Sequence, residues 1–479
     1  MTDVNKAIQP VQSVLITPLN EGAEYKANNY ILFRLSAAQL NMWLTNDSYL
    51  SFDFVYKRSA STLNDAAGGV NSMNPSYIRN AANIFRSIEI LYGSKTIYNQ
   101  PYNIEQNTIN TLTYGESYLT GNYATYTTRK TIANGQDYLK LDNGKTTASK
   151  DVVAAMDNEA TIKNVMVPIN QLFPTFQDMT SNGFPMRSLK SQLEFRLYIA
   201  EPYRYIVDWD HTIKDFSHQC RIASTDDTEK LKYLTTSIKE RFSSTNVKLS
   251  NVRMYCANYI PDQSTAALVD EKCGVGEGMK FKYSIVVSAL RQVDKLGMSN
   301  NLPFSVTTNN TKSLMLYCHR TGLSPSLMYR PLISSLYVKF GQNQLPFQPI
   351  AGNSFDTPFE YKFTSDDVLN NIDTYFTETN GDYNGSYRFI TSDATNATAR
   401  DIARNGVPTS SFVLMGANYV NDPSALGSQS SAWNSQYQAS FNSDSVETTI
   451  ANRPLTFVFG VRTEMGMIIK NNEIDTVNL

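Results

Sequence analysis

Ser87-Ile-Glu-Ile-Leu-Tyr-Gly93 and Ser335-Leu-Tyr-Val-Lys-Phe-Gly341 repeat one pattern, 248 residues apart in a chain of 479 residues. Both copies continue at the same spacing to a Gln-Pro pair, at residues 100–101 and 348–349. Ser, Gly, Gln and Pro are identical at equivalent places, and the apolar positions between them change conservatively. Each copy predicts a strand, a turn at the glycine, a second strand and a stop at the proline.

A second match follows downstream in the same order. Leu193 to Ile199 and Leu455 to Val461 alternate apolar and other residues in the same way, 262 residues apart, so the intervening segments differ by 14 residues. Two matches in one order favour a duplicated domain. The alternative is convergence, because many unrelated strands share this composition.

Alternation of apolar and polar residues dominates the rest of the chain. In Tyr49 to Tyr56, Leu50, Phe52 and Phe54 fall on one face, while Ser51 and Asp53 fall on the other. The stretches at 281–287 and 314–318 follow the same rule. A period of two predicts strands with one buried face, so we expect an all-β protein built from packed sheets.

Helical signals are few. The strongest is Asp262 to Lys272, with Pro261 before it and Asp262 as the expected N-cap. Asp366 to Ile372 and Asn103 to Leu112 are two weaker candidates. Two long polar stretches, Tyr102 to Ala160 and Asn421 to Asn452, are predicted to be surface loops. The second is expected to protrude from one end of a β domain; the alternative is a loop packed flat between two such domains.

Composition limits the classes of function. Lys plus Arg number 42 and Asp plus Glu 44, giving a net charge of −2, so no basic excess indicates nucleic-acid binding. No secretory leader and no apolar run of about 18 residues is present, so we expect neither secretion nor a membrane span. The four cysteines have no CxxC spacing and are expected to be free thiols, at positions 220, 256, 273 and 318.

Each motif that could indicate chemistry has a simpler explanation. Asn143-Gly-Lys-Thr146 resembles a P-loop tail but has Leu139 where the motif needs glycine. The run from Gly274 to Gly278 lacks the strand before and the helix after that a dinucleotide site needs, so a linker is expected. Cys318 and His319 are adjacent on a strand and point to opposite faces, which disfavours a shared zinc.

The acidic pairs Asp226-Asp227 and Asp366-Asp367 are adjacent rather than facing each other across a cleft, unlike a glycosidase pair. We therefore predict no catalytic residue, no cofactor-binding residue and no metal ligand, and expect that the protein is not an enzyme.

Four segments together resemble the double jelly-roll major capsid proteins of DNA viruses, the virophage and polinton-like branch most of all. They are Ile84 to Pro101, Val167 to Ile199 with its Phe184-Pro-Met186, Val252 to Asp262, and Leu455 to Leu479. The resemblance implies two tandem eight-stranded jelly rolls with short helices and long surface loops.

The expected division is an N-terminal arm at 1–11, a first roll at 12–262, a linker at 263–278 and a second roll at 279–479. The implied function is a homotrimeric, pseudo-hexagonal capsomer of an icosahedral shell. Its partners would be neighbouring capsomers, penton proteins and minor capsid proteins, with no specific nucleic acid. The protein would reside in the virion after synthesis in the host cytoplasm or nucleus.

A rival from another class is a carbohydrate-binding or fibre-like β-sandwich protein. Exposed tyrosine and tryptophan platforms would be its signature, and the chain has three tryptophans, Trp43, Trp209 and Trp433. Exposure of Trp43 or Trp209, which lie beside predicted strands, would favour this rival.

Overall fold

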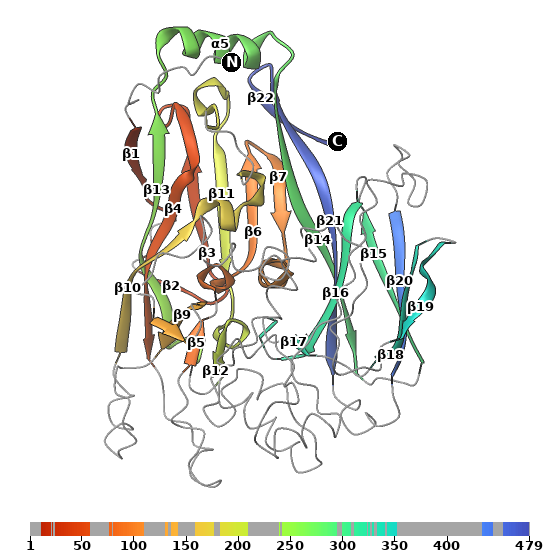
Figure 1. The fold of residues 1–479 in the computed structure, drawn as a ribbon. Helices are drawn as coiled ribbons and strands as arrows, with labels where there is room; N and C mark the ends of the chain where they lie inside the picture. Colours follow the sequence, from red (N-terminus) through yellow and green to blue (C-terminus); the bar gives the residue numbers. More distant parts are fainter. Residues whose placement is uncertain are drawn as a thin grey trace.

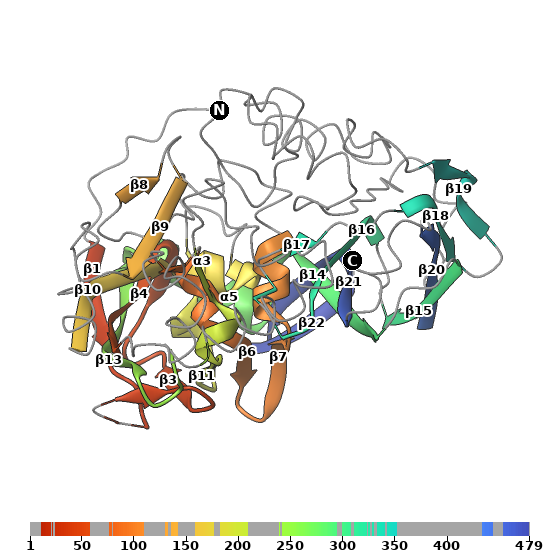
Figure 2. The same ribbon diagram turned by 90° about the horizontal axis from the view of Figure 1, so that it is seen from below.

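The fold is described from a computed structural model. It describes residues 11–57 (except 21 and 23), 76–78, 80–109, 130–132, 136–141, 159–176, 183–208, 239, 242–294, 299–307, 311–322, 324–325, 328–329, 333–340, 343–351, 434–443 and 454–478. Two groups of β-sheets lie side by side in this part of the chain, and a helix crosses one end of them (Figures 1 and 2).

The first group contains two main antiparallel sheets. One has the order β1-β13-β4-β10, and a short strand β2 also pairs with β13; the bounds are Val11–Ile16, Val247–Tyr259, Met42–Lys57, Glu159–Pro168 and, for β2, Tyr25–Lys26. The other has the order β3-β11-β6-β7, with bounds Tyr30–Leu35, Leu193–Ile199, Phe85–Tyr92 and Lys95–Gln100. The chain alternates between these facing sheets, as in a jelly roll, and we call this unit the first roll.

A smaller sheet lies beside the first roll, in the order β12-β5-β9-β8. Its bounds are Ile206–Asp208, Ser76–Ile78, Gln136–Leu141 and Lys130–Ile132.

The second group, here the second roll, is built in the same way. One sheet has the order β14-β21-β16-β17, with β22 also paired to β21; the bounds are Met279–Val293, Leu455–Lys470, Thr311–Arg320, Met328–Tyr329 and Glu473–Asn478. The facing sheet has the order β15-β20-β18-β19, with bounds Ser299–Thr307, Asn434–Ser443, Ile333–Phe340 and Asn343–Ala351.

Seven strands correspond between the rolls in both chain order and sheet position. The pairs are β1 with β14, β3 with β15, β4 with β16, β6 with β18, β7 with β19, β11 with β20 and β13 with β21. A counterpart of β10 is not among the described residues. The expected fold class, all-β with two jelly rolls, is therefore confirmed.

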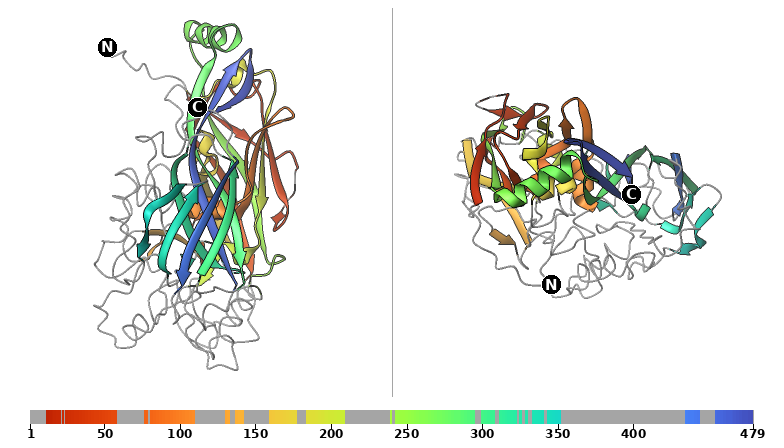
Figure 3. Two further views of the ribbon diagram at one scale, coloured as in Figure 1. Left: turned by 90° about the vertical axis from the view of Figure 1, so that its right-hand side faces the viewer. Right: turned by 90° about the horizontal axis from the view of Figure 1, so that it is seen from above.

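Helices are short, apart from α5 at Gln263–Gly274, which lies across one end of the strands (Figure 3). The expected helix and its cap are confirmed, since the Asp262 side chain accepts a hydrogen bond from the Thr265 amide. A helix also covers residues 103–109, within the range predicted. The remaining single turns are η2 (Ala81–Ile84), α3 (Ile169–Leu172), η3 (Pro174–Phe176), η4 (Met186–Ser188) and η5 (Pro202–Arg204).

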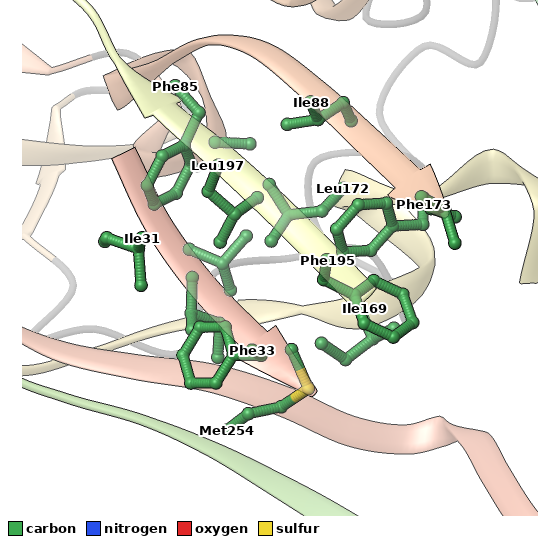
Figure 4. Close-up of a cluster of buried hydrophobic side chains, with 14 of the residues drawn as sticks. Ile31, Phe33, Phe85, Ile88, Ile169, Leu172, Phe173, Phe195, Leu197 and Met254 are labelled. Carbon is green, nitrogen blue, oxygen red and sulfur yellow. The ribbon is translucent and has the colours of Figure 1, made fainter. Parts of the chain in front are cut away.

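The core of the first roll is formed where its two sheets face each other. Phe33, Phe195 and Leu197 come from one sheet and Met254 from the other, and all are fully buried (Figure 4). Phe173, from the segment after α3, places its ring 4.9 Å from that of Phe195. The alternating residues of the predicted strands are thus the residues that close the roll.

Ser51 and Asp53 lie opposite Leu50, Phe52 and Phe54, as expected, but they too are buried. The reason at Asp53 is a pair of β-bulges with left-handed asparagines. Asn164 (φ 55°) on β10 donates its backbone N–H to Asp53 Oδ1 at 2.9 Å, and Asn251 (φ 50°) on β13 donates its side-chain amide to Oδ2 at 2.6 Å. A buried carboxylate with charge-assisted hydrogen bonds fixes the register of three strands at once.

The repeat prediction is half right. The hairpins β6–β7 and β18–β19 occupy equivalent positions, and Gly93 lies between the strands of the first; Gly341 lies outside the described residues. The second match is wrong, because Leu193–Ile199 is β11 whereas Leu455–Val461 belongs to β21, the counterpart of β13 in the opposite sheet. Apolar alternation alone does not distinguish two strands that each bury one face.

Both predicted loops contain regular structure, so those predictions are wrong in part. The range Tyr102 to Ala160 includes the helix at 103–109, β8, β9 and the start of β10. The range Asn421 to Asn452 includes β20, which lies between β15 and β18 and cannot be an exposed loop. Asp366 to Ile372 lies outside the described residues.

Candidate assembly interfaces

The junction between the two rolls contains a buried polar network on one side. Gln100, the last residue of β7, donates its amide to the backbone carbonyl of Val286 on β14 at 2.9 Å. The same amide contacts Gln106, which also accepts from the Tyr98 hydroxyl at 3.1 Å. Burial raises the pKa of Tyr98 well above its ordinary value. Since β14 is an edge strand, the Gln100 amide satisfies a carbonyl that its own sheet does not pair.

Apolar side chains complete this junction. Phe281 and Tyr283 of β14 are buried in one continuous cluster with the first-roll core, and the Phe281 ring lies 5.7 Å from that of Phe184. On the other face of β21, a Cβ added to Gly460 would lie 2.6 Å from Ile109 Cδ1. Glycine here allows the helix at 103–109 to approach the second roll closely.

The β21–β22 turn caps the same junction. Its residues Asn471 and Asn472 both have left-handed backbones, with φ of 55° and 62°. The Asn472 carbonyl accepts from the Tyr92 hydroxyl at 2.9 Å and from the Lys190 amide at 3.1 Å. Lys95 of the β6–β7 hairpin pairs with Asp475 of β22. The hairpin found by the internal repeat is therefore one of several parts of the first roll that contact the second.

The linker helix α5 is tied to both rolls. Arg187 donates two hydrogen bonds to Asp270, at 2.8 and 3.2 Å, and Ser188 donates a third at 2.7 Å. At the other end, the Cys273 carbonyl accepts from the Asn472 amide at 2.9 Å. The connector therefore contains the expected helix, which is hydrogen-bonded to residues of both rolls.

A buried carboxylate lies behind the junction, on the helix at 103–109. Glu105 is 1% exposed; its Oε1 accepts from Arg204 at 2.6 Å, and its Oε2 has no partner among the described residues. Burial raises the pKa of Glu105 above its ordinary value of 4.5, and Arg204 only partly opposes that shift.

The outer face of the β1-β13-β4-β10 sheet carries exposed apolar groups. Val11 and Leu15 on β1 are 56% and 47% exposed. Leu15 is paired in register with Tyr255, and Tyr255 with Tyr49, so the three form one row across the sheet. The two tyrosine rings stack at 4.9 Å and are half-buried. We call Val11, Leu15, Tyr49 and Tyr255 the β1 surface.

The outer face of the other sheet of the first roll is chemically different. Arg34 pairs with Glu194 at 2.6 Å, and Arg196 reaches Glu194 and Glu89 at 3.4 and 3.8 Å. These charges satisfy one another across three strands, as is common on a solvated face.

The residues singled out in the sequence do not form a catalytic or metal site within the described part of the chain. No group of three His, Cys, Asp or Glu side chains that could hold a metal is found there. Cys256 and Cys273 are free and buried, as expected for the thiols. Asn143 to Thr146, Asp226-Asp227 and Asp366-Asp367 lie outside the described residues, as do Cys220, His211 and His218.

Trp43 does not provide the exposed platform that a carbohydrate-binding protein would use. It is fully buried, its Nε1 donates to Ser48 at 2.9 Å, and its ring packs against Phe176 and Phe195. Trp209 and Trp433 lie outside the described residues.

The described helices include none with the length and apolar character needed to cross a membrane.

Comparison with known proteins gives similarity in fold and not in sequence. No protein-family model matches the chain, and no curated protein matches its sequence. A chain in the cryo-EM structure of the Sputnik virophage matches with a TM-score of 0.52 at 11% identity, over 100% of this chain and 90% of that one. The mavirus major capsid protein matches with a TM-score of 0.49 at 11% identity, over 100% and 92%. At this identity the Sputnik match shows the fold, a double jelly roll, in agreement with the strand order.

Proposed function

We propose that this chain is a major capsid protein, and that three copies form a pseudo-hexagonal capsomer of an icosahedral viral shell. The observation that carries the proposal is the pair of corresponding jelly rolls, side by side in one chain and joined through a buried junction. Two similar rolls per chain give six similar units per trimer, and a unit of that outline can tile a surface.

The physical basis is the rigidity of the rolls and the closure of a ring. Jelly rolls present stiff sheet walls for lateral contact. One heterologous interface, repeated about a three-fold axis, generates a closed trimer. The Sputnik chain, whose fold is the same, belongs to a virophage particle, and this origin supports the same role here.

The domain division belongs to the proposal: an arm at 1–11, rolls at 12–262 and 279–479, and a linker at 263–278. It is supported by the pairing of strands, since the described strands up to β13 pair with one another and those from β14 onward do likewise.

We place the protein in the virion, made in the host cytoplasm or nucleus, with a structural rather than an enzymatic role. Its partners are other copies of itself, neighbouring capsomers, penton proteins and minor capsid proteins. The net charge of −2 supports a wall that does not bind the genome specifically.

The proposal is tested with the purified full-length chain. Light scattering coupled to size exclusion should give three times the chain mass of 53.8 kDa, and electron microscopy should show hexagonal particles of uniform size. A folded protein that stays monomeric at high concentration, and forms no particles under crowding, contradicts the proposal.

A further inference from the structure

Two pairs of tyrosines lie directly opposite each other on neighbouring strands of the first roll. Tyr49 on β4 is in register with Tyr255 on β13, within the β1 surface. Tyr30 on β3 is in register with Tyr198 on β11, in the facing sheet. Tyr30 is 42% exposed and the other three rings are half-buried, so solvent reaches both pairs. The two pairs therefore differ in the geometry of their rings rather than in their access to solvent.

The Tyr49 and Tyr255 rings are stacked, with centroids 4.9 Å apart and planes inclined by 21°. Burial, and then the neighbouring Tyr255, raises the pKa of Tyr49 above its ordinary value of 10.0, so the two hydroxyl ends lie close enough to interact. In such a stack the ortho carbons, which flank each hydroxyl, face one another. The Tyr30 and Tyr198 rings are 5.7 Å apart and inclined by 40°, and the Tyr198 hydroxyl instead donates to Glu89 at 3.4 Å.

We infer that Tyr49 and Tyr255 form a site of oxidative cross-linking, at which a one-electron oxidant joins their two ortho carbons to give a dityrosine. The inference goes beyond the proposed function and does not depend on it, because the site requires only the pairing of β4 with β13 in one chain. Stacking already holds the two reacting carbons face to face, which replaces a random encounter by a positioned one.

The coupling removes two electrons and two protons in total. Each phenol gives one electron to the oxidant and its hydroxyl proton to water, which leaves a tyrosyl radical with much of its unpaired spin on the ortho carbons. The two radicals combine in one new carbon–carbon bond. The hydrogen on each joined carbon then moves to the phenol oxygen of the same ring, so that both phenols are restored.

Thiols would reduce the radicals before they couple, but the described thiols do not reach this face. Cys256 follows Tyr255 on β13, so its side chain points to the opposite face of the sheet, where it is fully buried. Cys273 is also buried. Coupling to the stacked ring is therefore the favoured fate of a radical at either tyrosine.

The link would restrain the centre of a sheet. β4 and β13 are the two inner strands of the order β1-β13-β4-β10. Tyr49 and Tyr255 are 206 residues apart, so the new bond closes a loop that contains the strands from β5 to β12. A cross-link that closes a long loop stabilises a protein mainly by restricting the unfolded chain. Oxidation should therefore raise the urea concentration at which the first roll unfolds.

The test illuminates the dilute full-length chain with ruthenium tris-bipyridyl and persulfate, which accepts the two electrons and becomes two sulfate ions. Trypsin should then release residues 35–57 joined to residues 254–272, at their summed mass less two hydrogen atoms. Fragment ions should place the bond at Tyr49 and Tyr255. Tyr49→Phe keeps the ring but removes the phenol, so this product should be lost in Y49F.

The Tyr30–Tyr198 pair is the matched control within the same sample. It should give about tenfold less cross-link, because coupling depends steeply on the alignment of the reacting atoms. Circular dichroism checks that Y49F folds, and Tyr255→Phe replaces it if it does not. Mixing heavy-nitrogen-labelled with unlabelled chains distinguishes a link within one chain from a link between chains.

The outcomes decide the inference directly. A product of 35–57 with 254–272 from single chains, lost in Y49F and in urea, supports it. Absence of that product while other tyrosines are oxidised overturns it, as does an equal yield in urea, an equal yield from the Tyr30–Tyr198 pair, or a product that joins labelled to unlabelled chains. Equal urea midpoints for oxidised wild type and oxidised Y49F overturn the stabilising effect.

Discussion

Replacing Gln100 with leucine should loosen the two rolls from each other. Leucine has a similar volume but cannot donate to the Val286 carbonyl, 2.9 Å away, nor accept from the Tyr102 amide, 3.1 Å away. Each buried group left without a partner costs about 1–3 kcal/mol. Burying leucine in place of an amide returns roughly 1–2 kcal/mol. At the midpoints of these ranges, about 4 kcal/mol is lost for the two groups and about 1.5 kcal/mol is returned, so the net loss in the free energy of unfolding is about 2.5 kcal/mol. Gln106 contributes nothing to this loss because it keeps its hydrogen bond from Tyr98.

The assay is urea denaturation followed by tryptophan fluorescence, together with calorimetry. Gln292→Leu is the matched control, on the same strand β14 but with an exposed side chain that donates to Asp294 at 3.3 Å. It should change stability by less than about 0.5 kcal/mol. Equal stabilities for Q100L and Q292L would refute the view that this amide holds the junction.

Three further outcomes are expected. Phe195→Ala should lower the free energy of unfolding by about 3–5 kcal/mol, measured by urea denaturation, because the ring is fully buried against Trp43 and Phe173; a loss below 1 kcal/mol contradicts the core described. Glu105→Gln should gain stability relative to the wild type as pH rises from 4 to 8. Because the folded pKa of this carboxyl is raised above 4.5, its contribution to stability is fully present below pH 4.5 and is lost as the pH rises through the folded pKa. A difference in melting temperature between wild type and E105Q that does not vary with pH argues against this. Cys256, whose pKa burial raises to about 12, should resist maleimide at pH 8 until urea unfolds the protein, as followed by mass spectrometry.

The sequence was informative where burial is one-sided. Strands such as Tyr49 to Tyr56 alternate because one face meets the core, so period two identifies them directly. The cap at Asp262 and the glycine turn at Gly93 were equally readable, because each depends on local backbone geometry.

Prediction from the sequence failed where a strand is stabilised by pairing with neighbouring strands rather than by large apolar side chains of its own. β20 contains Asn434-Ser-Gln-Tyr437 and resembles a polar loop, yet its backbone is paired on both sides, with β15 and with β18. Tertiary pairing of this kind overrides local composition.

The junction could not have been found from one sequence. Gln100 was noticed only as part of a repeated Gln-Pro pair, and its partner Val286 is 186 residues away in the chain. The repeat does not predict the role either. The two hairpins differ after their turns, with Ile88 opposite Gln100 in the first and Leu336 opposite Ile350 in the second.

Because α5 joins the two rolls of one chain, the contact between those rolls is an intramolecular equilibrium, whereas a contact between chains is bimolecular. It is a capped rod of 12 residues anchored at both ends, so the two rolls of one chain never separate beyond its reach. Such a tether supplies an effective concentration on the order of millimolar, independent of how dilute the protein is. Damage at the junction should therefore appear as increased motion between rolls that remain together, and dilution should not reveal it. A contact between chains has no such tether, and dilution alone can break it.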